Sequence, residues 1–174
     1  SYSNDGSMKP TLYVLMPTMP SRKGNWERLR SSWNEVREAG KEVMNLIWVP
    51  ILFKSEWDSL IREEREPLLT AGWILPLVIE NQQYDFLPVL HKVNQGLDWL
   101  GSRNPVNSWC YPESDDNLPP RNLIPQLASV SDGRVIVPSV ARGQHQTPNG
   151  YPTDTLTASP ENMRVGACTS AFFH

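Results

Sequence analysis

Cysteine is scarce in this sequence, since Cys110 and Cys168 are the only two in 174 residues. Two cysteines cannot build a disulfide framework, so both are predicted to be buried thiols in a reducing compartment, here the cytoplasm. No stretch approaches the roughly 18 consecutive apolar residues of a membrane span. The chain also lacks a lysine- and arginine-rich run and carries a net charge of −3, which argues against nucleic acid as a partner.

Glycine-rich phosphate loops are missing as well. The ten glycines form neither a G-x-G-x-x-G nor a G-x-x-x-x-G-K-[ST] pattern. Their absence argues against a Rossmann-type dinucleotide site and against a P-loop NTPase.

What is present is an alternation of strand-like and helical segments. Residues 1–9 are polar and are predicted to be a flexible N-terminal segment or a cloning scar, which leaves residues 10–174 as one domain. The alternation predicts an α/β fold with a single doubly wound, mostly parallel sheet and flanking helices. The predicted strands are residues 11–16, 45–53, 73–80, 108–111, 134–140 and 164–174, and the predicted helices are 26–40, 56–66, 87–101 and 119–130. In the helix 87–101, one apolar face is predicted from Leu87, Leu90, Val93, Leu97 and Leu100.

The segment after the strand 108–111 is strongly acidic. Glu113, Asp115 and Asp116 place three carboxylates within four positions. A fold tolerates such repulsion when the carboxylates are solvated or share a cation. The turn is therefore either a hard-cation site for Mg²⁺ or Mn²⁺, which would bridge carboxylate and diphosphate oxygens, or a solvated turn that caps the following helix.

Two further segments could hold a phosphorylated ligand. The loop from Pro17 and Thr18 to Arg22 follows the first strand and ends at a helix N-terminus, so it is either a nucleotide-binding loop or a simple connection. Lys92 and Asn94 lie near the start of a later helix, where Lys92 could neutralise diphosphate charge or belong to an ordinary solvated face.

In this order, the Pro-Thr-x-x-x-Arg loop, the segment Lys92-Val93-Asn94-Gln95-Gly96 and the acidic turn resemble the GT-A glycosyltransferases, particularly the small bacterial family-2-like enzymes. The resemblance covers roughly residues 10–174 and implies a GT-A-like, nucleotide-diphospho-sugar transferase type of fold. It implies transfer of a sugar from a nucleoside-diphosphate sugar to a glycan or small-molecule acceptor. The donor and a divalent Mn²⁺ or Mg²⁺ ion would be the cofactors.

The resemblance also assigns roles to individual residues. Nucleotide-sugar binding falls to Pro17, Thr18, Arg22, Lys92, Asn94 and Asp115. Asp116 matches the last aspartate of a D-x-D motif and would bind the metal, although Ser114 stands where a strict motif has its first aspartate. Glu113 or Asp115 would supply the other carboxylate, and His145 or His174 the third ligand. An acidic residue near the second strand, Glu56 or Asp58, would hold the base or the ribose.

An inverting enzyme needs a carboxylate that deprotonates the acceptor hydroxyl. Glu161 is favoured slightly over Asp154 for this role, and a retaining enzyme would not need the base in the same position. Three alternatives stay open. They are a nucleotidyltransferase, a catalytically silent nucleotide-sugar-binding module, and a metal-dependent hydrolase or phosphoryl-transfer domain that uses the acidic turn.

Overall fold

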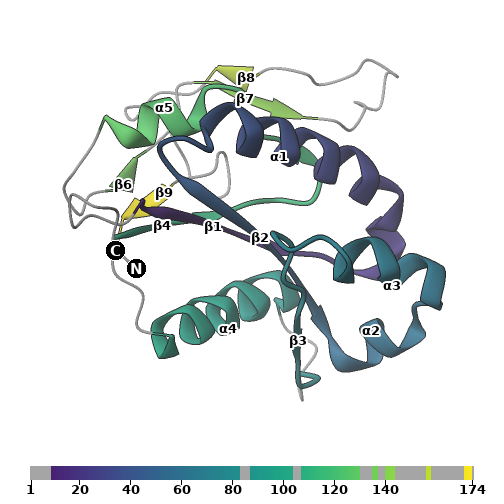
Figure 1. Ribbon diagram of the computed structural model, residues 1–174. Helices are drawn as coiled ribbons and strands as arrows, with labels where there is room; N and C mark the ends of the chain where they lie inside the picture. The colour runs from purple at the N-terminus through teal and green to yellow at the C-terminus, as the bar shows by residue number, and fades with distance from the viewer. Residues whose placement is uncertain are drawn as a thin grey trace.

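The computed structural model describes residues 9–82, 87–103 and 107–129, together with the backbone of residues 135–136, 140–143, 156–157 and 171–173. Its centre is a sheet with the strand order β3-β2-β1-β4-β9-β6 (Figure 1). The bounds of these strands are Leu77–Ile79 for β3, Asn45–Phe53 for β2, Thr11–Pro17 for β1, Ser108–Pro112 for β4, Ala171–Phe173 for β9 and Val135–Ile136 for β6.

The first four strands of this order run parallel. β1 lies between β2 and β4, with Leu12 opposite both Leu46 and Trp109. β9 then pairs antiparallel with β4, and β6 antiparallel with β9. The predicted α/β class with a mostly parallel sheet is confirmed.

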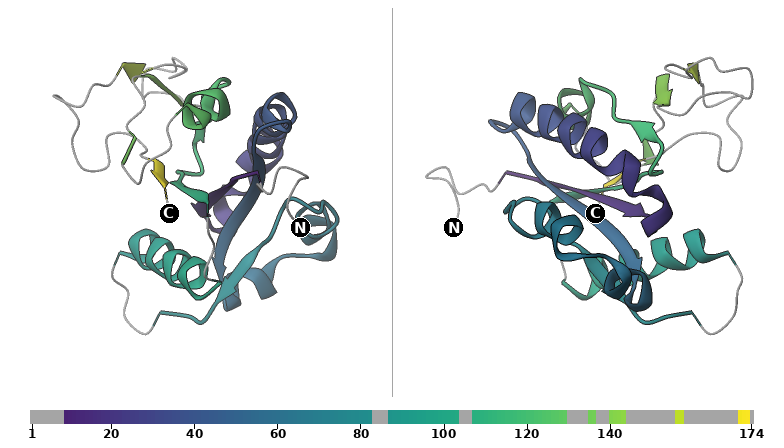
Figure 2. Two further views of the ribbon diagram at one scale, coloured as in Figure 1. Left: turned by 60° about the vertical axis from the view of Figure 1, so that its left-hand side comes forward. Right: turned by 90° about the vertical axis from the view of Figure 1, so that its right-hand side faces the viewer.

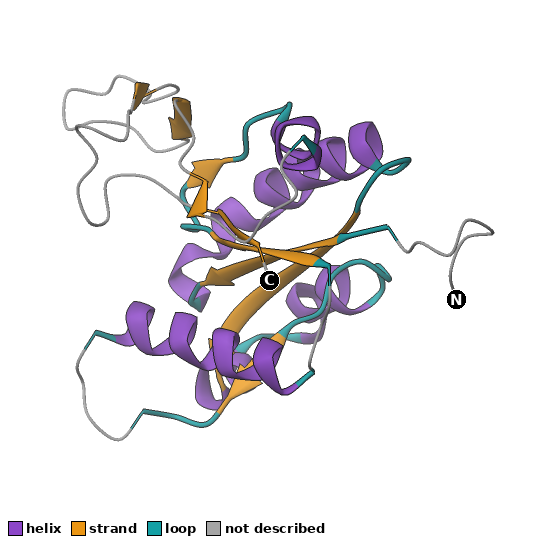
Figure 3. Cartoon of the chain, turned by 90° about the vertical axis from the view of Figure 1, so that its left-hand side faces the viewer, coloured by secondary structure: helices purple, strands orange, loops and turns teal. Residues whose placement is uncertain are grey.

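Helices cover both faces of the sheet, which confirms the doubly wound arrangement (Figures 1 and 3). α1 (Trp26–Gly40) and α5 (Leu123–Ala128) lie on one face, and α4 (Pro88–Ser102) lies on the other. α2 (Lys54–Ser59) and α3 (Arg62–Leu69) follow the carboxyl end of β2. None of the described helices is long and apolar enough to span a lipid bilayer.

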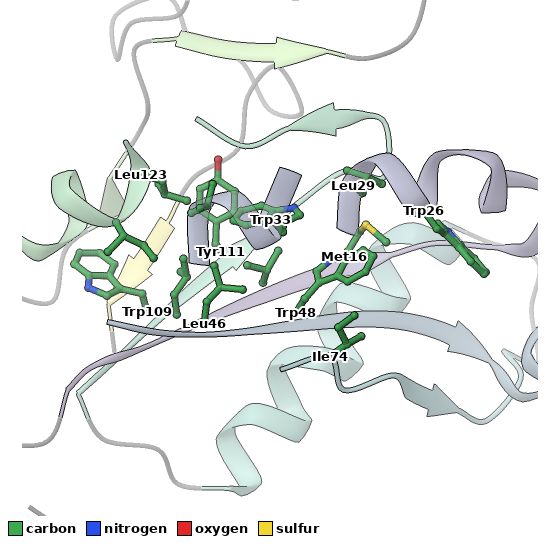
Figure 4. Close-up of a cluster of buried hydrophobic side chains, with 14 of the residues drawn as sticks. Met16, Trp26, Leu29, Trp33, Leu46, Trp48, Ile74, Trp109, Tyr111 and Leu123 are labelled. Atoms are coloured by element: carbon green, nitrogen blue, oxygen red, sulfur yellow. The ribbon is translucent and has the colours of Figure 1, made fainter. Parts of the chain in front are cut away.

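Side chains alternate between the two faces along β1. Leu12, Val14 and Met16 belong to the same core cluster as Trp33 of α1. Figure 4 shows Met16 and Trp33 in this cluster. Leu15 belongs instead to a smaller cluster with Leu100 of α4. A strand covered on both faces is continuously apolar in sequence, which is why the run at 11–16 predicted it correctly.

Two predicted elements are shorter or divided. The predicted strand 73–80 keeps only a single bridge at Ile74 and the short β3, because Pro76 has no N–H to donate to a ladder. The predicted helix 56–66 is split into α2 and α3 at Leu60 and Ile61. Both linking residues are extended, with ψ angles of 140° and 164°.

The chain beyond the acidic turn also differs from the prediction. The helix predicted at 119–130 is limited to α5, and β5 (Asn117–Leu118) precedes it. β5 pairs with β7 (Val140–Gly143), which pairs in turn with β8 (Leu156–Thr157). β7 and β8, which no sequence pattern predicted as a pair, therefore form a small second sheet with β5, seen beside α5 in Figure 2.

The predicted apolar face of α4 is correct at Leu100 but wrong at Leu87, Leu90 and Leu97, which are exposed. Lys92, Gly96 and Leu100 are buried against the sheet, whereas Leu90 and Leu97 are 53 % and 41 % exposed. The physical reason is close packing at Gly96. A Cβ atom at this position would lie 2.8 Å from Ile51 Cδ1 and 3.2 Å from Leu15 Cδ1.

Gly96→Ala is therefore expected to lower the free energy of unfolding by about 1–3 kcal/mol, as overpacking does, despite the higher helix propensity of alanine. Gly101→Ala in the same helix is the matched control, because a Cβ there meets nothing within 4 Å. Chemical denaturation of both variants measures the difference. Equal stabilities would contradict the close approach of α4 to the sheet.

Candidate functional site

The loop after β1 and the acidic turn after β4 meet at the carboxyl edge of the sheet. β1 and β4 are parallel neighbours, so their ends lie side by side, where ligands of such sheets bind. Thr18 Oγ1 donates a hydrogen bond of 3.0 Å to Asp115 Oδ2, and Trp26 Nε1 donates one of 2.9 Å to Thr18 Oγ1. Thr18 and Asp115 are only 3 % and 7 % exposed, so this polar chain is built into the fold.

Two more side chains of the same loop reach the turn. Arg22 Nε lies 3.5 Å from Asp115 Oδ1, and the amide of Asn25 donates a 3.1 Å hydrogen bond to the Asp115 carbonyl. The loop is a 3₁₀ helix, η1 (Pro20–Asn25), that leads directly into α1. Asn25 is the N-cap residue of α1, but its side chain bonds to the acidic turn and makes no cap hydrogen bond.

Burial raises the pKa of Asp115 above the ordinary aspartate value, and the Thr18 hydrogen bond and the Arg22 charge oppose that shift. Asp116 next to it raises the pKa further. The ionised form of Asp115 therefore costs stability, since burial disfavours charge. A carboxylate kept under such conditions at a strand end is a candidate functional group.

The other two carboxylates of the turn bond locally. Glu113 Oε1 accepts a 2.8 Å hydrogen bond from the Ser114 N–H, and Asp116 Oδ1 accepts one of 2.5 Å from Ser114 Oγ. Asp115 points instead toward Thr18 and Arg22. Among the residues that the structure describes, no three His, Cys, Asp or Glu side chains come together as a metal site.

The acidic turn can still hold a metal that arrives with its ligand. Mg²⁺ usually binds through one or two carboxylates plus substrate phosphates. Asp116 is half-buried and Ser114 is exposed, so the turn is open to solvent on this side. The residues of the turn could hold a cation whose other ligands come from a bound diphosphate. They do not by themselves supply enough ligands for a complete metal site.

Lys92 reaches the site from α4 on the opposite face of the sheet. Its side chain is 2 % exposed. Nζ donates hydrogen bonds of 2.6 Å to the Thr18 carbonyl and 2.8 Å to Glu56 Oε1, and lies 4.5 Å from the centre of the Phe53 ring. Lys92 thus joins three elements behind the Thr18 loop, and its ammonium group is covered by the protein itself.

The remaining predicted residues divide into two groups. Pro17 is buried at the end of β1, while Asn94 is exposed on α4, two residues from the buried Lys92 and so on the opposite side of the helix. The structure does not bring Asn94 to the turn. Four predicted residues lie outside the described part of the chain: His145, Asp154, Glu161 and His174.

Sequence reasoning did not place Trp26 at this site, and it named Glu56 as a ligand of the base or ribose rather than as the partner of Lys92. Glu56 Oε1 accepts from the Phe53 N–H at 2.8 Å as well as from Lys92, so it caps α2 and pairs the lysine at once. A glutamate three residues into a helix is a capping signal. The indole of Trp26 carried no such signal, because apolar spacing alone assigns it to the core.

Neither a scan of protein-family models nor a search of curated proteins returns a match for this chain. The fold and the site define an α/β domain with an acidic turn and a polar loop at the carboxyl edge of a parallel sheet. Residues 18, 22 and 115 are in direct contact there.

Proposed function

We propose that this chain is a GT-A-like glycosyltransferase domain that binds a nucleoside-diphosphate sugar at the edge formed by Thr18, Arg22 and the acidic turn. The observation that supports the proposal most is the contact of Thr18 and Arg22 with Asp115, across 97 and 93 positions of sequence. Separate parts of the sequence that resembled one family come together at one edge of the sheet. The buried thiol of Cys110, whose pKa burial raises to about 12, suits a reducing compartment such as the cytoplasm.

The proposed roles follow from exposure and charge. Arg22 is 47 % exposed and faces the turn, so its guanidinium is available to a diphosphate while it pairs with Asp115. Asp116 would hold a Mn²⁺ or Mg²⁺ ion bound together with the donor. Such an ion, when bound, stabilises the charge that develops on a departing diphosphate.

Lys92 takes a different role from the one that the resemblance implied. Its ammonium group donates to Thr18 and Glu56, so we assign it to positioning the loop rather than to contact with the diphosphate. Glu161 or Asp154 would deprotonate the acceptor in an inverting reaction. A catalytically silent module is the second candidate, favoured by the engagement of Asp115 with the protein's own Thr18 and Arg22.

Calorimetry with UDP and GDP, each with and without Mn²⁺, tests the proposal on the wild type and on Asp116→Ala. We expect metal-dependent binding that Asp116→Ala weakens at least tenfold, because the metal loses its carboxylate. Asp98→Ala is the matched control, since Asp98 is exposed on α4 and has no described partner. Absence of nucleotide binding under every condition would overturn the proposal, and binding without turnover of any sugar donor would favour the silent module.

A further inference from the structure

A hollow of about 730 Å³ lies at the opposite end of the sheet from the candidate site. It is formed where β1 and β2 begin and where α1 and α4 end. Its size is within the range of small-molecule pockets, roughly 300–1,000 Å³. The residues that matter most in its lining are Tyr13, Arg37, Asn45, Trp73 and Arg103.

The charge of this hollow is opposite to that of the chain. Among the described residues, two arginines line it and no aspartate or glutamate does, although the net charge of the protein is −3. Within the described residues, neither Arg37 nor Arg103 forms an ion pair. A concave surface of one charge sign concentrates ligands of the other sign.

Both guanidinium groups are held in place by aromatic rings. Arg37 lies 5.2 Å from the centre of the Trp73 ring and donates two hydrogen bonds, of 3.2 and 3.0 Å, to Asn34 Oδ1. Arg103 lies 4.9 Å from the centre of the Trp99 ring, which packs edge-on against Tyr13. Stacking and hydrogen bonding restrict these side chains before any ligand arrives, which reduces the entropy cost of binding.

The two arginines approach from opposite faces of the sheet. Arg37 lies in the last turn of α1 and Arg103 follows α4, and these helices cover different faces (Figure 3). Between them, the first residues of β2 form an open edge on the side away from β1. Among the described residues, the contacts on that side are β3, which pairs with Ile51–Phe53, and the Trp48–Ile74 bridge. A ligand that contacts both arginines has to pass around this edge, so one small anionic group does not suffice.

We propose that this hollow binds an elongated anion that carries at least two phosphate or carboxylate groups, one for each arginine. Asn45 and Tyr13 supply further polar groups, and Trp73 an apolar wall. The site is independent of the proposed nucleotide-sugar site, since it lies at the amino ends of the strands. Its occupancy therefore does not depend on the glycosyltransferase proposal.

Titrations with inorganic tripolyphosphate and with citrate, at constant ionic strength and without divalent metal, test this site. Tryptophan fluorescence is the signal, because Trp73 lines the hollow and Trp99 adjoins it. Arg37→Gln and Arg103→Gln are each expected to weaken binding about tenfold, the loss of one charge-assisted contact. Comparison of the two ligands shows whether phosphate or carboxylate is preferred.

Arg28→Gln is the matched control, since Arg28 is an exposed arginine of α1 outside the hollow. Arg103→Lys keeps the positive charge at the end of α4, so it provides a second variant at this position if Arg103→Gln does not fold. Far-ultraviolet circular dichroism checks that every variant is folded. Lack of binding by the wild type, or an equal loss in Arg28→Gln, would overturn the proposal.

Discussion

Asp115→Asn is expected to abolish metal-dependent nucleotide binding while leaving the protein at least as stable as the wild type at neutral pH. The carboxylate is 7 % exposed, and burial raises its pKa. Asparagine has nearly the same shape, and its Oδ1 can accept the Thr18 hydrogen bond. The substitution thus removes a buried charge without opening a cavity, and it removes the charge that pairs with Arg22 near the proposed ligand.

The pH dependence of stability gives this prediction its sign. Because the folded-state pKa of Asp115 lies above the unfolded value, the folded state binds more protons in the interval between the two. The contribution of Asp115 to stability therefore falls as the pH rises through that interval, and the cost is fully present above the folded pKa. In Asp115→Asn, this decrease in stability with rising pH should be absent.

Urea unfolding at several pH values, with calorimetry of UDP and Mn²⁺ binding, measures both effects. Asp98→Asn, an exposed aspartate on α4, should change neither quantity. A variant that binds as well as the wild type would remove Asp115 from the functional site. If Asp115→Asn were less stable than the wild type at neutral pH, the ionised carboxylate would support the fold. That result would contradict the prediction that ionised Asp115 lowers the stability of the folded state.

Much of the fold follows from the sequence where one physical rule dominates. After Thr11, the run at 12–16 is apolar because β1 is covered on both faces, and the alternation of such runs with helices is enough to predict the parallel sheet. The division at Leu60 and Ile61 was missed because helical spacing continues across it. Glu64 caps the second helix by accepting from the Ile61 N–H at 2.9 Å, which is a local signal that spacing does not show.

The α4 helix shows where hydropathy fails. Its exposed face carries Leu90 and Leu97, whereas its buried face carries Lys92 and Gly96. Hydropathy ranks a lysine as outward-facing and a glycine as neutral, so the pattern placed Leu100 correctly but missed the other two buried residues. Only the tertiary partners of these residues, the Thr18 carbonyl, Glu56 and the side chains of β1 and β2, explain why they face the sheet.

The candidate site was predictable in the parts that follow from topology. Thr18 and Asp115 each follow a strand, and neighbouring parallel strands end at one edge, so their contact is expected once the order β1-β4 is known. The side of α4 that Asn94 occupies depends on the rotation of one helix, which the motif resemblance does not fix. The direction of the three carboxylates depends on hydrogen bonds with Ser114 and Thr18 that have no pattern in sequence.

Lys92→Met is expected to destabilise the protein by about 3 kcal/mol, the lower part of the range for breaking a buried ion pair, since Glu56 retains 20 % exposure. Methionine can occupy the space of the lysine stem, but it donates nothing to Glu56 or to the Thr18 carbonyl. For a domain of this size the loss corresponds to a fall in melting temperature of roughly 6–12 °C. Thermal and urea unfolding measure it.

A double-mutant cycle separates the ion pair from the packing of the side chain. Glu56→Gln keeps an acceptor for the Phe53 N–H, and it removes the charge that Lys92→Met would leave unpaired. If the pair acts as a unit, Lys92→Met/Glu56→Gln should be more stable than the sum of the single changes implies, with a coupling energy of about 1 kcal/mol or more. Lys41→Met is the surface control, because its ion pair with Glu38 is 58 % and 50 % exposed and should contribute less than about 0.5 kcal/mol. Additive single changes would show that Lys92 and Glu56 do not act as a unit. A Lys92→Met variant no less stable than Lys41→Met would show that the loop after β1 does not depend on this lysine.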